Sequence, residues 1–235
     1  MMKVLAFNAS PKMGKGNTAL ILNPFLEGMR EAGAEVELFY TRKLKINPCQ
    51  GELNCWLKTP GKCFQKDDMQ MLLPKLREAD IQVFATPVYY VGMPGPMKNL
   101  IDRMNPLWEP FLELYDGHCS GHPREGTKHS KVVLVSSCGY WEMDNFDLLL
   151  DYMRIFDFAG ALLRPHADAL RPMMEEGAPL DDISEAAKEA GRQLVRDGEM
   201  SAETLATVSR ELMPLEKYIE FYNQGFQEAL DALKK

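Results

Sequence analysis

Five short apolar runs separated by helix-like segments are the feature that most constrains the fold of this 235-residue chain. The apolar runs cover residues 3–7, 35–40, 80–86, 131–137 and 161–167. Helical periodicity fills the intervals between them at residues 18–32, 67–78, 96–104 and 145–158. Nearly continuous apolar runs are typical of strands buried on both faces, and parallel strands need helical crossovers. We therefore expect an α/β fold with a doubly wound, five-stranded parallel sheet of order 2-1-3-4-5.

Two regions fall outside this alternation. Residues 105–130 form a long segment with several aromatic and histidine side chains, and loops of that length are usually functional or mobile. The tail is helical in pattern, with segments at 181–196, after a capping Ser201, and at 214–234. We expect a sheet domain over residues 1–176 and a helical C-terminal extension over residues 177–235.

Composition excludes several classes of protein. The net charge of −7 argues against binding nucleic acid through bulk electrostatics. No run of 18 apolar residues exists, so we expect no membrane span, and the N-terminus has no signal-peptide pattern. Five cysteines in such a chain favour a reducing, cytoplasmic compartment over a disulfide framework.

The loop Asn8-Ala-Ser-Pro-Lys-Met-Gly-Lys-Gly-Asn-Thr18 joins the first strand to the first helix. Its glycines let a ligand approach the backbone, and the amides of the helix N-terminus attract anions. Anion binding is strengthened further by hydrogen bonds from hydroxyl and amide side chains and by the positive charge of two lysines. The residues concerned are Ser10, Lys12, Gly14, Lys15, Gly16, Asn17 and Thr18. The loop therefore predicts a phosphate site.

Three kinds of phosphate site compete for this loop. A nucleotide-hydrolysing P-loop requires Gly-Lys-Ser/Thr, whereas Gly16 is followed by Asn-Thr. The pattern Gly14-x-Gly16-x-x-Ala19, with Glu37 further on, matches a dinucleotide fingerprint, but it begins too far beyond the strand. A long, hydroxyl-rich loop suits a terminal monophosphate better. A solvated turn without ligand is the remaining alternative.

The loops after the third and fourth strands add aromatic side chains at the same edge of the predicted sheet. Pro87 to Pro96 is dense in proline and glycine and carries Tyr89 and Tyr90, while Ser136 to Trp141 combines small residues with aromatics. Taken alone, the aromatic side chains of either loop could serve ordinary packing. Together with the phosphate loop they favour a planar heterocycle with one phosphate, which is FMN.

With these motifs the chain resembles the NAD(P)H-dependent FMN reductase and iron–sulfur flavoprotein group of the flavodoxin-like superfamily. The resemblance extends over about 170 residues and includes the first loop, Cys-Gln-Gly51, Gly61-Lys-Cys-Phe-Gln-Lys-Asp-Asp-Met69, Thr86-Pro-Val-Tyr-Tyr-Val-Gly92 and Lys98-Asn-Leu-Ile-Asp-Arg103. It implies a flavodoxin-like fold and a homodimer or dimer of dimers (a homotetramer), formed through the helix at 97–103.

The resemblance also implies which residues hold FMN. The phosphate would lie on Ser10, Lys12, Gly16, Asn17 and Thr18. The second loop would pack along the isoalloxazine ring with Pro87, Val88, Tyr89, Tyr90, Val91 and Gly92. The third loop would close the site with Ser137, Cys138, Gly139 and Tyr140, and Trp141 could border the open face.

The cysteines depart from the iron–sulfur members, which carry four closely spaced thiolates for a four-iron cluster. Here Cys49, Cys55 and Cys63 remain, and Glu52 occupies the place of the second ligand. Ligation by Glu52 or by the distant Cys119 is the alternative. We expect no iron–sulfur cluster and interpret the cysteines as small buried groups or oxidisable thiols.

A second group of potential ligands lies in the long segment. His118, Cys119, His122 and His129 have side chains that suit zinc. Their spacing is neither that of a helix nor that of a CxxC motif, so we expect no metal here.

These features predict an enzyme that transfers hydride from NAD(P)H through bound FMN to a small acceptor such as a quinone or free flavin. FMN carries out the redox chemistry, so no catalytic side chain is obligatory, and two alternating substrates imply ping-pong kinetics. Backbone amides of residues 90–92 and Gly139 are expected near the ring. A flavodoxin-like carrier passing electrons between proteins is the main alternative, and a flavin-free nicotinamide dehydrogenase is a further one.

Overall fold

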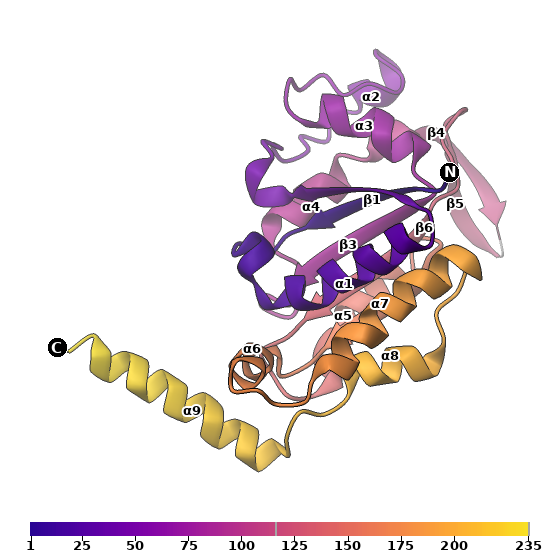
Figure 1. Ribbon diagram of the computed structural model, residues 1–235. Coiled ribbons are helices and arrows are strands. Elements are labelled where there is room, and N and C mark those ends of the chain that lie inside the picture. Colours follow the sequence, from indigo (N-terminus) through magenta and orange to yellow (C-terminus); the bar gives the residue numbers. More distant parts are fainter. Residues whose placement is uncertain (116, 235) are drawn as a thin grey trace.

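A five-stranded parallel sheet forms the centre of the computed structural model, which describes residues 1–115 and 117–234 (Figure 1). Its strands are β1 (Lys3–Asn8), β2 (Glu35–Tyr40), β3 (Ile81–Pro87), β6 (Lys131–Ser137) and β7 (Phe158–Arg164). They are hydrogen-bonded in the order β2-β1-β3-β6-β7, and every neighbouring pair is parallel. Numbered within the sheet, this is the order 2-1-3-4-5, so the predicted flavodoxin-like topology is confirmed.

Helices cover both faces of the sheet. The helices of the described chain are α1 (Asn17–Glu31), α2 (Asn54–Leu57), α3 (Met69–Glu78), α4 (Gly95–Asp102), α5 (Asp147–Met153), α6 (Ala167–Glu175), α7 (Asp181–Arg196), α8 (Ala202–Ser209) and α9 (Leu215–Ala232). Short 3-10 turns add η1 (Met13–Lys15), η2 (Thr41–Lys43), η3 (Asn105–Leu107) and η4 (Met143–Phe146). One buried cluster joins the sheet to α1, α6, α7 and α8, and a second joins it to α3, α4 and α5.

Successive residues of β1 explain the two clusters. Val4 and Ala6 belong to the first cluster, whereas Leu5 and Phe7 belong to the second. Side chains of a strand alternate between the faces of a sheet, so a strand covered on both faces is apolar throughout. This is why the predicted strands are nearly continuous apolar runs.

The helix α7 packs directly on α1 (Figure 1), and two glycines permit the close approach. A Cβ atom on Gly28 would lie 1.8 Å from the carbonyl oxygen of Lys188, and one on Gly191 would lie 2.1 Å from that of Phe25. Neither position has room for a methyl group. The C-terminal segment therefore contributes to the same core as the sheet.

Three expectations about secondary structure were wrong. The last strand begins three residues earlier than the predicted 161–167, and Pro165, which has no N–H to donate, follows its end. The helix predicted over 145–158 is divided into η4 and α5. Helix α6 was not predicted at all.

The segment expected to be a long loop contains an antiparallel hairpin. Its strands are β4 (Trp108–Tyr115) and β5 (His118–Pro123), and they form a separate two-stranded sheet. Leu112 and Leu114 on this hairpin are exposed. Exposed apolar side chains gave the segment no pattern of burial from which a strand could be recognised.

The last helix leaves the body of the molecule (Figure 1). Tyr218 near its start is buried, whereas every residue from Asn223 to Lys234 is exposed. The division between residues 176 and 177 stays a prediction, and Lys235 lies outside the described residues. None of the helices in the described part of the chain is long and apolar enough to cross a lipid bilayer.

Candidate functional site

The loop between β1 and α1 is a cradle of backbone amides. Within it, Met13 donates to the carbonyl of Ser10 at 2.9 Å and Gly16 to that of Met13 at 3.2 Å. The N–H groups of four residues make no hydrogen bond within the described chain, namely Lys12, Gly14, Asn17 and Thr18. Unpaired amides at a helix N-terminus are suited to an anion.

Helix α1 offers nothing else to satisfy these amides. Among the described residues no side chain caps its N-terminus, and its first turn has no acidic residue. Gly16 is buried, and a Cβ atom there would lie 2.4 Å from the Ser10 hydroxyl oxygen. Lys12 and Lys15 are exposed beside the loop, and the buried side-chain amide nitrogen of Asn8 lacks a partner in the described chain. The residues present therefore fit a phosphate group.

Side chains from other elements hold this loop in place. Arg42, just after β2, donates to the carbonyl of Pro11 at 2.7 Å. Arg171 of α6 donates to the carbonyl of Lys15 at 3.1 Å. Asn17 donates through its side chain to the carboxylate of Asp168 at 2.8 Å.

Sequence reasoning missed Arg42, Asp168 and Arg171. Arg42 could have been found, because it follows directly after a strand end at the ligand-binding edge. Asp168 and Arg171 belong to α6, the helix that was not predicted.

Ser137 connects the three loops. Its hydroxyl lies 2.7 Å from that of Thr18, and its carbonyl accepts a hydrogen bond from Val88 N–H at 2.8 Å. The sequence-predicted residues of the first, second and third loops therefore meet at one edge of the sheet.

The second loop contains a tight turn at Tyr90 and Val91. Tyr89 and Gly92 exchange backbone hydrogen bonds of 2.8 and 3.1 Å across it. The φ angles of Tyr90 and Val91 are 50° and 59°, a left-handed conformation that is rare for a β-branched residue such as valine and costs about 1–3 kcal/mol. The amides of Tyr90 and Val91 are unpaired within the described chain, whereas Gly92 N–H is used inside the turn.

The third loop also presents a backbone amide. Cys138 N–H donates to the carbonyl of Arg164 at 3.0 Å, and Tyr140 N–H donates to the Cys138 sulfur at 3.3 Å. Gly139 N–H has no partner in the described residues, and a Cβ atom on Gly139 would lie 2.8 Å from Asp168 Oδ2. Burial raises the pKa of the Cys138 thiol, which stays protonated at neutral pH.

The aromatic side chains differ in their surroundings. Tyr90 is fully exposed, and Tyr89 and Tyr140 are 51% and 65% exposed, so a face beside the loops is open. The Trp141 ring instead stacks on His166, and its indole N–H donates to the carbonyl of Met213 at 3.0 Å. Trp141 therefore lies against the C-terminal segment.

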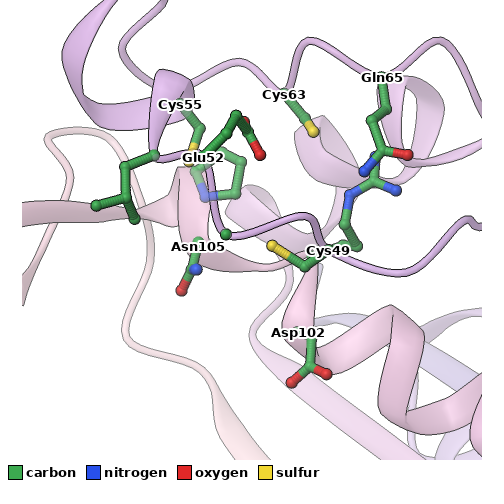
Figure 2. A pocket seen from close by; sticks show the side chains of 11 residues that line it. Cys49, Glu52, Cys55, Cys63, Gln65, Asp102 and Asn105 are labelled. Carbon is green, nitrogen blue, oxygen red and sulfur yellow. The ribbon is translucent and has the colours of Figure 1, made fainter.

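The three clustered cysteines line one small pocket together with Glu52 and Arg103 (Figure 2). Cys55 is buried, and its burial, together with the nearby Cys63, Glu52 and Cys49, raises the pKa of its thiol. In the described part of the chain no three or more His, Cys, Asp or Glu side chains are placed to hold a metal ion. Three thiols and one carboxylate also do not fit a four-thiolate cluster. The absence of a cluster stays a prediction.

A buried ion pair fixes this cysteine-bearing loop to α4. Arg103 donates to both carboxylate oxygens of Asp67, at 2.8 and 3.0 Å, and to the carbonyl of Asn47 at 2.7 Å. Both side chains of the pair are buried, and the guanidinium and two backbone amides hold the pKa of Asp67 below its usual value despite that burial.

The histidine group is divided between elements. His118, Cys119 and His122 lie on β5, while His129 lies beyond the hairpin with its Nδ1 3.2 Å from the carboxylate of Asp157. The expectation that no metal binds here also stays a prediction.

Comparisons with known proteins agree with this geometry. The NADPH-dependent FMN reductase family matches residues 2–171. An iron–sulfur flavoprotein of Archaeoglobus fulgidus is 40% identical over 102 residues, which cover 43% of this chain and 48% of the relative. The chain spans about half the length of this and other curated iron–sulfur flavoproteins that it matches.

Two further proteins match over more of their length. A putative NAD(P)H-dependent FMN-containing oxidoreductase of Bacillus subtilis is 29% identical over 161 residues, which cover 68% of this chain and 80% of that protein. The crystal structure of a putative quinone reductase from Klebsiella pneumoniae aligns with a TM-score of 0.61 and 21% identity, covering 83% of this chain and 86% of that one. The latter likeness supports the fold. Because the family match covers most of the chain, the protein belongs to the NADPH-dependent FMN reductase family.

Proposed function

We propose that this protein binds FMN and transfers hydride from NAD(P)H to a small acceptor such as a quinone or free flavin. The observation that carries the proposal is the set of unpaired amides at Lys12, Gly14, Asn17 and Thr18. They surround Gly16, where a Cβ atom would have no room. A phosphate held there would leave the rest of the cofactor beside the second and third loops. When bound, FMN supplies the redox chemistry.

The protein's own contribution is binding and orientation. The amides of Tyr90, Val91 and Gly139 have no partner in the described chain, which supports a role as donors to a ring at this edge. Preorganised donors stabilise negative charge that develops during reduction. The strained turn at Tyr90 and Val91 leaves two of these amides without a partner in the described chain. The open face beside Tyr89 and Tyr140 leaves access for the nicotinamide and the acceptor in turn.

Anaerobic reduction tests this function. NADPH or NADH added to FMN-loaded protein should bleach the visible flavin absorbance within a catalytic turnover, and a quinone should restore it. Initial rates at several concentrations of both substrates should give parallel double-reciprocal lines. A purified protein that takes up no FMN, or intersecting lines, would contradict the proposal.

A second candidate is a flavodoxin-like carrier that passes electrons between proteins. The fully exposed Tyr90 at an open edge of the site favours it. A carrier would be bleached only when a separate reductase is added. Direct bleaching by the nicotinamide therefore distinguishes the two.

We further propose a cytoplasmic homodimer or homotetramer. The exposed half of α9 supports assembly, because an isolated helix of about a dozen residues is marginally stable without a partner. All five cysteines are free thiols, which supports a reducing compartment. Light scattering of the full chain should give two or four times the mass of one chain.

A further inference from the structure

The third loop of the site is tied to the C-terminal segment of the chain. Tyr218 of α9 donates its hydroxyl hydrogen bond to the carbonyl of Gly139, across 79 residues of sequence. Trp141 donates its indole N–H to the carbonyl of Met213 at 3.0 Å, across 72 residues. The loop is therefore held at two points from outside the sheet.

His166 contacts both the third loop and the C-terminal segment. Its backbone N–H donates to the carbonyl of Tyr140 at 2.7 Å, and its Nε2 accepts a hydrogen bond from Leu212 N–H at 2.9 Å. The imidazole stacks on Trp141 with ring centroids 6.0 Å apart and meets the edge of Tyr218 at 5.7 Å. His166 is 1% exposed. It accepts at Nε2, so it is the neutral tautomer with the proton on Nδ1.

Arg164 anchors the same segment to β7. Its guanidinium is fully buried and donates to the carbonyls of Val208 at 2.7 Å, Ser209 at 3.3 Å and Arg210 at 2.5 Å. A buried cation that lost these acceptors would be left without solvation. Residues 208–218, which we name the C-terminal strap, are thus held to the sheet and cannot detach without exposing this charge.

The strap determines how one peptide unit of the third loop is turned. The carbonyl of Gly139 faces Tyr218, and the N–H of Tyr140 in the same peptide plane faces the Cys138 sulfur at 3.3 Å. The preceding peptide carries the Gly139 N–H, and its Cys138 carbonyl accepts a hydrogen bond from Ala167 N–H of α6 at 2.8 Å. Gly139 is thus held on one side by α6 and on the other by the strap, and its N–H remains unpaired in the described chain.

We infer that Tyr218 is a positioning residue, which acts through the Gly139 carbonyl to hold Gly139, and with it the unpaired Gly139 amide, in place beside the bound flavin. This inference rests on the proposed function. A Tyr218→Phe variant keeps the ring and its contact with His166 but removes one hydrogen bond. Because an aimed amide stabilises reduced flavin more than oxidised flavin, the midpoint potential of bound FMN should become more negative in the variant.

The experiment compares Tyr218→Phe with Tyr152→Phe, a half-buried tyrosine on α5 away from the loops. In the FMN-free protein, amide hydrogen exchange at Cys138 and Tyr140, whose N–H groups are hydrogen-bonded, should quicken about 3- to 10-fold in Tyr218→Phe and stay unchanged in Tyr152→Phe. In the FMN-loaded protein, only Tyr218→Phe should lower the midpoint potential. Trp141→Phe, which removes the bond to Met213 O, should loosen the same residues and serves if Tyr218→Phe does not fold.

The two measurements separate the inference from the proposed function. Unchanged hydrogen exchange in both Tyr218→Phe and Trp141→Phe would show that the strap does not hold the third loop, whether or not FMN binds. Faster exchange without any change in the midpoint potential would overturn the positioning role. Faster exchange in a protein that binds no FMN would overturn the proposed function and, with it, the role of Tyr218 toward flavin.

Discussion

The contact between α1 and α7 gives a prediction whose size follows from the geometry. In Gly191→Ala the added methyl carbon would lie 2.1 Å from the carbonyl oxygen of Phe25 and 2.9 Å from the amide nitrogen of Met29. Both atoms belong to the backbone of α1, so no side-chain rotation can relieve the overlap. The helices must separate by about 1 Å, and a close-packed interior resists that movement.

Two opposing terms set the net change in stability. Alanine is the better helix former by about 1 kcal/mol in a helix interior. Overpacking typically costs about 1–3 kcal/mol and more where backbone must move. We therefore expect the free energy of unfolding of Gly191→Ala to fall by about 2 kcal/mol. For a chain of this size that corresponds to a melting temperature lower by roughly 4–8 °C.

Gly225→Ala is the matched control, because Gly225 also lies inside a helix but a Cβ atom there meets nothing within 4 Å. Urea unfolding followed by circular dichroism should show Gly225→Ala as stable as the wild type or slightly more stable. The opposite sign for the two variants is the expected result. A Gly191→Ala protein at least as stable as the wild type would refute the packing argument.

Three further predictions concern the cofactor loop, a buried histidine and a buried ion pair. Gly16→Ala should weaken FMN binding about tenfold or more, measured by fluorescence titration, because its methyl group would lie 2.4 Å from the Ser10 hydroxyl oxygen. Burial and the Arg164 charge lower the pKa of His166 from 6.5 to about 4, so only the unfolded chain gains a proton between these values. The free energy of unfolding should therefore fall by up to about 3 kcal/mol as pH drops from 6.5 to 4, measured by urea unfolding. Arg103→Leu should cost about 3–5 kcal/mol in the same assay, because the buried Asp67 carboxylate loses its cation.

Each of these has its own control. Gly225→Ala should bind FMN as the wild type does. In His166→Gln the free energy of unfolding should lose the part of its pH dependence that comes from the imidazole. If the free energy of unfolding still falls as steeply between pH 6.5 and 4, His166 is not the group responsible. The double variant Arg103→Leu/Asp67→Leu should be more stable than Arg103→Leu, because no lone charge remains buried.

The sequence alone predicted the sheet and the cofactor edge. Strands such as 131–137 are apolar on both faces, and that pattern depends only on the residues themselves. The loop from Asn8 to Thr18 was recognisable because glycines and a helix start are encoded locally. Both observations concern interactions within a few residues of one another.

Other elements could not be found in this way. The hairpin at 108–123 carries exposed apolar side chains, although the Asp116-Gly117 dipeptide in the sequence is typical of hairpins. Helix α6 begins two residues after Pro165, and its start at His166 adopts a left-handed conformation with φ 38°. No local propensity predicts such a start.

The sequence by itself determined the strand order, the class of cofactor site and the family. Only the tertiary structure decided that α7 rests on α1 through Gly28 and Gly191, and that Tyr218 reaches the Gly139 carbonyl. The physical reason is the separation along the chain of the residues that interact. Periodicity and turn chemistry act between near neighbours in the chain, whereas the fit of two backbones, or a hydrogen bond across 79 residues, exists only once the whole core has assembled.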